Sequence, residues 1–600
     1  MKSYSPTQKV LLCGAAVAAF GLAALQSVGC KPNEQSKNVE NKELPNEHLA
    51  LTKVAIAAHI DQLGSGELKA GPSDHTMFGG TIFRNMVNPI DKNIPDKFEP
   101  DGPDTIWKVG LGSRAYGGPI ISAGKVFAGT NNESEKPRNA RDTRKTKEGE
   151  IEFIDRGVLL CLDEKTGKFL WQAVHPKLES GQVNDWPKEG LCSTPTVEGD
   201  RVYYVTNRCT VVCADVNGPA SKLPGGIVRK GFSDPTDAKF IWEYDMIKSL
   251  NVFPHNMSAC SPLIVGDIIF VVTANGVDEG HINLPSPEAP SFIALDKKEG
   301  KLLWQSNAPG KEIMHGQWSN PVYAEIDGVK QVIFPGGDGW LRSFVPETGA
   351  PIWKFDCNPK DAVYELGGTG TKNDFIGTPV VHENKVYIGV GQDPEHTTSI
   401  ANFFCIAPTK KGDISKTTIS GRDKNGKPLD EKPNPNSCEV WRYGGVENAK
   451  WAQRDFKFGR TMSSACIVDD ILYISELTGF LHCFNAKTGE HYWQFDTKAS
   501  IWGSPYFVDG KIFLANDQGE MFIFKHEKEH KVYDEVKATE NATTLKAARE
   551  AMKGVQKQVA DKYLLSKTVF DAPIRSTPIV ANGVLYVMTE KTLYAIKCGK

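Results

Sequence analysis

The sequence lacks an excess of charge of either sign. Its 600 residues include 70 Lys and Arg against 73 Asp and Glu, a formal net charge of −3 at pH 7. Proteins that bind nucleic acid through its phosphates carry a basic excess, so no nucleic-acid partner is expected. The chain also has no Cys-x-x-Cys-His motif, which argues against a covalently attached c-type haem.

Cysteine is present but is not arranged as a disulfide framework. Of 13 cysteines, two lie in the first thirty residues, which leaves eleven, an odd number. Cys209 and Cys213 could pair across a hairpin, and the sequence leaves that pairing open. A cysteine that recurs at one place in a repeat is a packing residue, because a buried thiol packs as a small apolar group. Four cysteines recur in this way: Cys161, Cys213, Cys405 and Cys483.

Residues 1–30 have the organisation of a secretory signal peptide. Lys2 and Lys9 precede an apolar run at 10–25, which is short for a transmembrane helix. The small residues before Cys30 resemble a lipoprotein lipobox, although Ser27 stands where Leu is usual. We therefore expect export to the periplasm or cell envelope, either with ordinary cleavage or with lipidation of Cys30 and tethering to a membrane. The polar chain that follows suits a tether within an N-terminal extension, 31–76.

A short motif recurs along the rest of the chain. Each copy starts with small residues next to Pro or Ser, continues as an alternating apolar run, and reaches a Lys-Thr-Gly-like turn. In six copies a closing strand with Trp follows the turn. One copy cannot bury its own apolar face, so this period indicates a propeller or a solenoid. The eight copies start near Pro119, Pro195, Pro262, Pro321, Pro379, Ser464, Pro505 and Pro578.

The last two copies depart from the pattern. The seventh has no closing Trp, and strong helix formers at 543–565 predict a helical insertion at about 540–566. The eighth stops at Cys598 after its third strand. The strand at 105–109 can supply its missing fourth strand and remove both exposed edges. We therefore predict an all-β fold, an eight-bladed propeller of four-stranded blades in a domain at 77–600. A linear solenoid is the alternative.

The third strand and its turn carry a recognisable motif. Residues 294–304 read Ala-Leu-Asp-Lys-Lys-Glu-Gly-Lys-Leu-Leu-Trp, close to the docking motif Ala-x-Asp-x-x-Thr-Gly-x-x-x-Trp, and 157–171 carry a variant. In this motif the chain, from about Met77 onward, resembles the eight-bladed propellers of the pyrroloquinoline-quinone (PQQ) type. The resemblance implies the fold but not the function, because the motif serves blade packing. That family contains calcium- and quinone-dependent alcohol dehydrogenases and also cofactor-free scaffolds, such as the outer-membrane assembly lipoprotein.

The sequence departs from the dehydrogenases where the resemblance implies their active site. Asn275 occupies the place of a calcium-binding Asn, but Ser319 stands where the family has a catalytic Asp. A serine hydroxyl cannot accept a proton from an alcohol without a base of its own. The adjacent cysteine pair that stacks on the quinone is absent, and Met257 falls near the place of the Trp on its other face.

Two further quinone and calcium contacts are missing. The sequence Gly337-Asp338-Gly339 lacks the basic residue that contacts the quinone, and 206–210 offer no calcium-binding Glu. A hard cation needs several oxygen ligands. We therefore expect no cofactor. The alternative is PQQ with calcium, bound near Asn275, Trp318 and Trp502.

The loops that enter the innermost strands are expected to surround the channel on one face. They carry mostly cationic residues, which suit a small anionic ligand or an acidic segment of a partner protein. A solvated rim is the alternative. The residues are Arg114, Glu189, His255, His315, Asp374, Arg460, Trp502 and Arg575.

Two inserted loops, 276–290 and 391–399, also contain Asp, Glu and His. Neither has a metal-ligand spacing such as His-x-x-x-His, so solvated loops are predicted there and the metal content is left undecided. The sequence as a whole predicts an exported, non-catalytic propeller that binds a partner through its channel face. A quinone-dependent dehydrogenase with an altered site is the alternative, in which Glu189 or Asp374 would replace the missing base.

Overall fold

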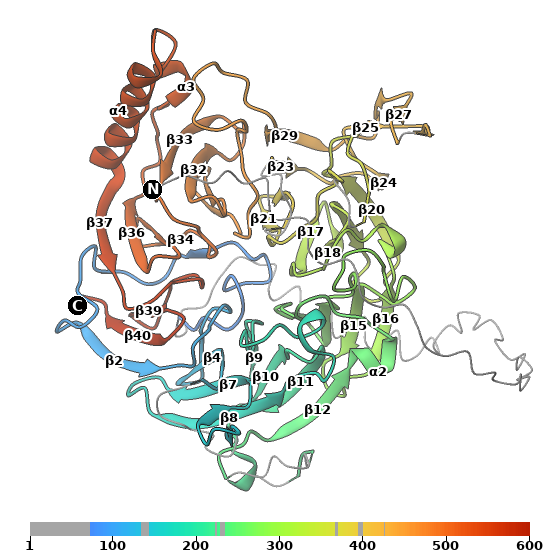
Figure 1. Cartoon of the computed structure of the whole chain (residues 1–600), viewed down its shortest axis with the longest axis vertical. Helices are drawn as coiled ribbons and strands as arrows, with labels where there is room; N and C mark the ends of the chain where they lie inside the picture. Colours follow the sequence, from blue (N-terminus) through green and yellow to red (C-terminus); the bar gives the residue numbers. More distant parts are fainter. Residues whose placement is uncertain are drawn as a thin grey trace, which may run out of the picture. The chain divides into compact units, whose positions relative to one another are not determined.

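The computed structural model describes residues 73–133, 143–222, 225–227, 235–366, 370–393, 400–424 and 426–599. In these residues eight sheets, each built on four antiparallel strands, surround a common centre as the blades of a propeller (Figure 1). The predicted eight-bladed fold is therefore confirmed, and the linear solenoid is excluded. The predictions of a signal peptide and of lipidation at Cys30 lie outside the described residues.

In blades one to four the strands follow one another in chain order, with a separate hairpin inserted between the second and third strands of blade one, and the first strand of each blade is the innermost (Figure 1). Their strands are β3 (Ile120–Ser122), β4 (Lys125–Asn131), β7 (Arg156–Asp163) and β8 (Phe169–Pro176); β9 (Thr196–Glu198), β10 (Arg201–Val205), β11 (Thr210–Asp215) and β12 (Phe240–Asp245); β13 (Leu263–Val265), β14 (Ile268–Val272), β15 (Phe292–Asp296) and β16 (Leu302–Ser306); and β17 (Val322–Ile326), β18 (Val329–Pro335), β19 (Trp340–Phe344) and β20 (Pro351–Asp356).

Blades five to eight follow the same order but include the insertions and the ring closure. Their strands are β21 (Val380–His382), β22 (Lys385–Val390), β23 (Asn402–Ile406) and β29 (Glu439–Gly444); β30 (Cys466–Val468), β31 (Ile471–Ser475), β32 (Phe480–Asn485) and β33 (His491–Asp496); β34 (Tyr506–Val508), β35 (Lys511–Ala515), β36 (Glu520–Lys525) and β37 (Leu564–Val569); and β38 (Ile579–Ala581), β39 (Val584–Met588), β40 (Thr592–Lys597) and β2 (Thr105–Gly110).

The ring closes as the sequence predicts. Strand β2 pairs antiparallel with β40, so that Trp107 faces Ala595. In blade seven, helices α3 (Glu535–Ala538) and α4 (Leu545–Tyr563) separate β36 from the closing strand β37. Helix α4 lies within the stretch for which the sequence indicated a helix, and it packs along the outer side of the ring beside β33 and β37 (Figure 1).

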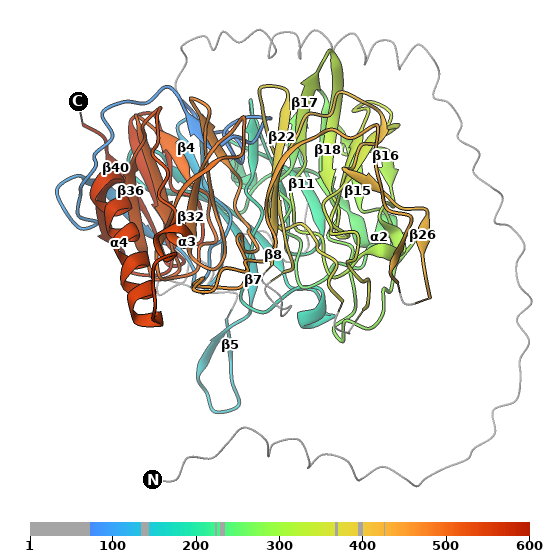
Figure 2. The same ribbon diagram turned by 90° about the horizontal axis from the view of Figure 1, so that it is seen from above.

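Smaller elements lie outside the blades. The hairpin of β5 (Thr143–Lys145) and β6 (Ile151–Phe153) extends away from the ring (Figure 2). The short helix α2 (Met246–Leu250) follows β12. None of the helices in the described residues is both long and apolar enough to cross a bilayer. The remaining short strands are β1 (Val87–Asn88), β24 (Gly412–Asp413), β25 (Thr417–Thr418), β26 (Gly421–Arg422), β27 (Pro428–Leu429) and β28 (Lys432–Pro433).

Neighbouring blades are joined by tryptophan docking. In five blades the indole Nε1 of the closing strand donates a hydrogen bond to a backbone carbonyl in the turn after the third strand of the next blade. Burial of the large ring and satisfaction of its N–H are thus achieved together. The bonds join Trp107 to Glu164 (2.9 Å), Trp171 to Val216 (3.1 Å), Trp242 to Lys297 (3.2 Å), Trp304 to Pro346 (2.7 Å) and Trp441 to Ala486 (2.9 Å).

The residue that faces each docking tryptophan across the ladder is small. Cys161 faces Trp171 and Ala294 faces Trp304, and in each pair the register shifts by a bulge just beyond the contact. Cys213, Cys405 and Cys483 face a Trp in the same way. The recurring cysteines are therefore packing residues, and all eleven cysteines of the described residues are buried and free, Cys209 and Cys213 included.

A segment near the N-terminus, residues 73–88, closes the channel from within; we call it the plug segment. It is hydrogen-bonded to the innermost strand, or the residues directly before it, in every blade. For blades one to eight the pairs are Ile121 N to His75 O (3.0 Å), Val197 N to Thr76 O (2.8 Å), Arg84 Nη2 to Ser261 O (3.2 Å), Tyr323 N to Ile82 O (3.1 Å), Val381 N to Phe83 O (3.0 Å), Ile467 N to Asn85 Oδ1 (2.9 Å), Phe507 N to Met86 O (2.9 Å) and Asn88 Nδ2 to Val580 O (2.9 Å).

Arg84 is the centre of the plug segment. Its side chain is fully buried, and burial lowers the pKa of its guanidinium to about 10. Its donors reach the carbonyls of Phe78 (2.8 Å), Ser261 (3.2 Å) and Pro321 (3.2 Å). A planar fork of five N–H groups can satisfy several carbonyls at once, which a lysine ammonium cannot do in the same geometry. Arg84 thus ties the plug segment to blades three and four.

Replacement of Arg84 by Met should destabilise the propeller by about 3 kcal/mol, because it leaves several buried carbonyls without donors. The control is Arg201→Met, since Arg201 is partly exposed, donates to the carbonyl of Lys298 and pairs with the exposed Asp200. We expect a change within about 1 kcal/mol for the control. Denaturant midpoints of the two variants measure the difference, and equal midpoints would show that the plug segment does not stabilise the ring.

Replacement of Gly300 by Ala should weaken the contact between blades two and three. Gly300 has φ +69°, and a Cβ there would lie 2.5 Å from the Trp242 ring. Gly124 has φ +72° and open space around it, so Gly124→Ala is the matched control. Backbone strain alone costs about 1 kcal/mol in both variants, and the clash adds about 1–3 kcal/mol at Gly300. If both variants lose the same free energy of unfolding, the contact of Trp242 with Gly300 does not contribute measurably to the stability of the propeller.

Candidate functional site at the channel mouth

The loops that enter the innermost strands surround a cavity of about 390 Å³. Its wall is mainly aromatic and thioether: four aromatic rings and two methionines contribute, beside Ile376 and Ala259. Glu189, His315, Asp393 and Asn256 add polar groups, and Cys192 a thiol. The aromatic and thioether residues are Tyr116, Trp186, Trp318, Trp502, Met257 and Met462.

The candidates from the sequence divide into residues that line the cavity, residues buried beside it, and arginines. Glu189, His315 and Trp502 line the cavity together with Trp318. His255 and Asp374 are buried, with 1% and 2% of their surface exposed. The arginines do not line this cavity and have partners within the protein.

The arginine charges are paired rather than free for a ligand. Arg114 Nη1 lies 2.8 Å from Glu590 Oε1, and Arg575 lies 2.9 Å from the same oxygen and 2.8 Å from Asp517. Arg460 Nη1 donates to the carbonyl of Asp393 (2.8 Å). Hydrogen bonding and the charge of Glu590 raise the pKa of Arg114 against the opposing effect of burial. The channel face therefore carries less available positive charge than its residue types suggest.

Arg575 also stiffens the aromatic wall. Its guanidinium lies over the rings of Tyr116 (5.1 Å) and Trp502 (5.0 Å), and those two rings contact each other edge to face. Burial raises the pKa of Tyr116, and the neighbouring charge of Glu189 and its hydrogen bond with the phenol raise it further, so the phenol stays neutral. The rings are thus fixed before any ligand arrives.

Two polar atoms of cavity-lining residues have no hydrogen-bond partner in the described part of the chain. These are Glu189 Oε2, an acceptor, and Trp502 Nε1, a donor, and both are buried. A buried polar group without a partner costs about 1–3 kcal/mol. Such atoms are usually satisfied by water or by a ligand. The cavity therefore offers one acceptor and one donor to an occupant.

Among the described residues, the plug segment occupies the inner end of the channel. A second, smaller cavity of about 120 Å³ shares Tyr116, Cys192, Ala259, Met462 and Trp502 with the first. Its other walls include His75, Phe78 and Met86, which belong to the plug segment. The plug segment therefore forms the inner limit of the site.

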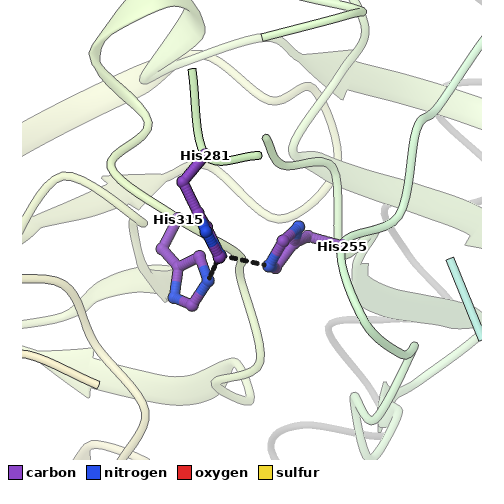
Figure 3. A group of neighbouring side chains, drawn as sticks. All are labelled: His255, His281 and His315. Atoms are coloured by element: carbon purple, nitrogen blue, oxygen red, sulfur yellow. Dashed lines mark hydrogen bonds between the residues drawn. The ribbon is translucent and has the colours of Figure 1, made fainter. Parts of the chain in front are cut away.

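Three histidines meet at one point (Figure 3), and one of them, His315, lines the cavity. His255 precedes β13, His281 lies in the connection between β14 and β15, and His315 precedes β17. His281 Nε2 lies 3.2 Å from His255 Nε2 and 2.7 Å from His315 Nε2. Gly276 permits this approach, since a Cβ there would lie 2.4 Å from His315 O and 2.7 Å from His255 Cβ.

Buried carboxylates stand behind His315. Asp393 Oδ2 lies 2.8 Å from His315 Nδ1, and both side chains are almost fully buried. Asp374 is held close by, because its N–H donates to the carbonyl of Gly391 (3.0 Å). Ligand atoms of His315, Asp374 and Asp393 all lie within 4.8 Å of one another. Blades three, four and five thus contribute to a single polar cluster.

Asn275 does not line the cavity. It is fully buried, its Oδ1 accepts from Phe253 N (3.0 Å), and its Nδ2 donates to Ser286 O (2.9 Å). Ser319 Oγ donates to the carbonyl of Gly377 (2.9 Å). Asp338, at the place of the basic quinone contact, forms a bidentate pair with Arg342 (2.8 and 2.7 Å). The residues present therefore do not fit a calcium-bound quinone.

Sequence reasoning missed His281 and the aromatic residues Tyr116 and Trp186. His281 is 26 residues from His255 and 34 from His315, so no local spacing could indicate a shared site. The predicted solvated loop at 276–290 is in fact partly folded back, with His281 turned toward the other two histidines (Figure 3). Glu395 and His396, in the other inserted loop, lie outside the described residues.

The fold and the docking motif define the class of this protein as an eight-bladed propeller of PQQ-type repeats. The family model described as "Outer membrane protein assembly factor BamB" matches residues 155–425 and 434–563, more than half of the chain. The chain belongs to this family.

Individual relatives are distant. The BamB of Shewanella oneidensis is 22% identical over 275 residues, which are 39% of this chain and 67% of that protein. Quinohemoprotein alcohol dehydrogenase from Comamonas testosteroni has a similar fold, with a TM-score of 0.50 at 11% identity over 92% of this chain and 84% of that one. BamB from Moraxella catarrhalis has a TM-score of 0.45 at 13% identity, over 82% of this chain and 99% of that one.

Proposed function

We propose that this protein is an exported, non-catalytic propeller of the cell envelope that binds a partner protein at its channel mouth. Membership in the BamB family supports a role of this kind, since the relative's name is that of an outer-membrane assembly factor. The signal-peptide-like sequence of residues 1–30 supports export. Tethering through a lipidated Cys30 belongs to the same proposal.

The observation that carries the proposal is the cavity with its two unsatisfied polar atoms. Aromatic rings held by Arg575 and adaptable methionine side chains suit an apolar side chain of a partner, because the rings lose little freedom on binding and the methionines can adjust to its shape. A peptide group presents one N–H and one C=O, which are the partners that Glu189 Oε2 and Trp502 Nε1 lack. A loop of a partner protein therefore suits this cavity better than a small anionic ligand, because the nearby arginines are paired internally.

The alternative function is a PQQ- and calcium-dependent dehydrogenase. Its support is that Trp318, Trp502 and the carboxylate of Glu189 line one cavity. Against it, the side chain of Asn275 is used by two backbone groups, and the serine at the place of the catalytic base donates to a carbonyl. The resemblance to the dehydrogenases placed a calcium-binding Glu at 206–210, and the sequence has none there. Beside Asn275, these positions therefore supply no second oxygen ligand for calcium.

A photo-crosslinking side chain placed at Trp186, a partly exposed residue of the cavity wall, should form an adduct with a partner protein in the source cells. Leu429, exposed in β27 on an insertion of blade five, is the control position. We expect an adduct of defined mass from position 186 and none from 429. Addition of Trp502→Phe, which removes the indole donor and keeps a ring, should lower the adduct yield severalfold. Equal adducts from both positions, or no effect of Trp502→Phe, would contradict binding in the cavity.

Titration of the purified protein with PQQ and calcium tests the alternative. We expect no heat of binding in calorimetry and no reduction of an artificial electron acceptor with alcohols. Micromolar or tighter binding together with reduction of the acceptor would establish the dehydrogenase function and overturn the proposal. The two experiments are independent, because the crosslink does not depend on the cofactor.

A further inference from the structure

The His255–His281–His315 cluster has the arrangement of a metal site. Three Nε2 atoms from three different loops face one another, at 3.2 Å and 2.7 Å from the central His281 (Figure 3). The ring centroids of His255 and His315 are 4.3 Å apart. Three imidazoles rarely crowd together in this way for packing alone, because each carries a polar ring nitrogen on the crowded side.

The opposite nitrogens of two rings are already engaged. His255 Nδ1 lies 2.8 Å from the carbonyl oxygen of Val277, and His315 Nδ1 lies 2.8 Å from Asp393 Oδ2. Both oxygens are acceptors, so in each ring the proton belongs on Nδ1 and the lone pair on Nε2. A backbone carbonyl or carboxylate in this position is the usual support for a metal-ligating histidine, since it fixes the tautomer and the ring orientation.

The two contacts of His281 Nε2 within the cluster are unequal. When His255 and His315 carry their protons on Nδ1, both present lone pairs to His281 Nε2. A neutral His281 has one N–H to share between two acceptors, at unequal distances of 2.7 and 3.2 Å. A cation between the rings would accept a lone pair from every nitrogen, with His281 in its Nδ1–H form.

We propose that His255, His281 and His315 bind a first-row transition metal ion, with Zn²⁺ as the reference ion. Zinc accepts neutral imidazoles at about 2.0–2.1 Å, which sets tetrahedral N···N separations near 3.4 Å. The 3.2 Å pair is close to this separation, and an outward shift of His281 by about 0.7 Å brings the 2.7 Å pair to it. Three protein ligands leave one coordination position for water or for an occupant of the cavity.

The surroundings suit a cation. Asp393 and Asp374 are buried with 1% and 2% of their surface exposed, and they bring negative charge next to the three neutral imidazoles. Arg460, the other charged side chain beside them, compensates part of that charge. His315 also lines the 390 Å³ cavity, so the ion would lie at its wall.

The loop that carries His281 is held in position by its own contacts. Asp278 Oδ1 accepts from Ile282 N (2.9 Å), Asp278 Oδ2 accepts from Asn283 Nδ2 (2.7 Å), and His281 N donates to the carbonyl of Asp278 (3.0 Å). Asn275 joins this loop to the segment of His255. Its amide bonds to Phe253, two residues before His255, and to Ser286 in the His281 loop. Two of the ligands are thus arranged before the metal arrives.

Calorimetric titration of the chelator-treated full-length protein with Zn²⁺ tests the proposal. We expect one ion per chain, and Co²⁺ in its place should give the intense visible absorption of a four-coordinate site. His281→Ala should weaken Zn²⁺ binding by at least a hundredfold. Asp393→Asn should weaken it about ten- to a hundredfold, as for other supporting carboxylates. His382→Ala, on the partly exposed end of β21, is the control and should bind as the wild type does.

Thermal unfolding separates a lost ligand from a lost fold. Zn²⁺ should raise the Tm of the wild type and of His382→Ala but not that of His281→Ala, while the three metal-free proteins unfold at similar temperatures. Absence of binding to the wild type, or equal affinity of His281→Ala, would overturn the proposal. It would also be overturned if Asp374→Asn abolished binding while His281→Ala did not, because the ion would then lie between His315 and the two aspartates.

Discussion

The structure depends on the contacts between the plug segment and the eight innermost strands. Each innermost strand has an edge toward the axis, and an unpaired edge exposes N–H and C=O groups. Residues 73–88 supply a partner to every blade in turn, with Arg84 serving blades three and four. The consequence for function is geometric. The segment limits the channel from within, so that the mouth is a pocket with a floor, and His315 and Asp393 are buried in its wall.

Tryptophan docking fixes the blades relative to one another, and that rigidity allows loops of three blades to form one site. Asn275 stands where the similar dehydrogenases have a calcium-binding Asn, but here its amide has a structural role. It joins the chain beside His255 to the loop of His281. The aromatic wall, held by Arg575, and the histidine cluster then lie side by side at the pocket, one suited to an apolar group and the other to a cation.

Repetition made the fold predictable from the sequence. Period, turn glycines and docking tryptophans occur in many copies, and the missing strand of the last blade had one source, at Thr105–Gly110. The plug segment was not predictable, because its bonds run mostly from its backbone to distant strands. The role of His281 was not predictable either, because the arrangement of the blades brings it to His255 and His315, which are 26 and 34 residues away in the sequence. The arginines misled in another way: their carboxylate partners, Glu590 and Asp517, lie on other loops.

The central claim is that this propeller carries an imidazole metal centre at its channel mouth in place of a calcium-bound quinone. Diffraction from crystals grown with Zn²⁺, measured on both sides of the zinc absorption edge, tests it directly. The account predicts one anomalous peak within bonding distance of Nε2 of His255, His281 and His315, at the wall of the pocket. A peak at Asn275, or none at the three histidines, would contradict it.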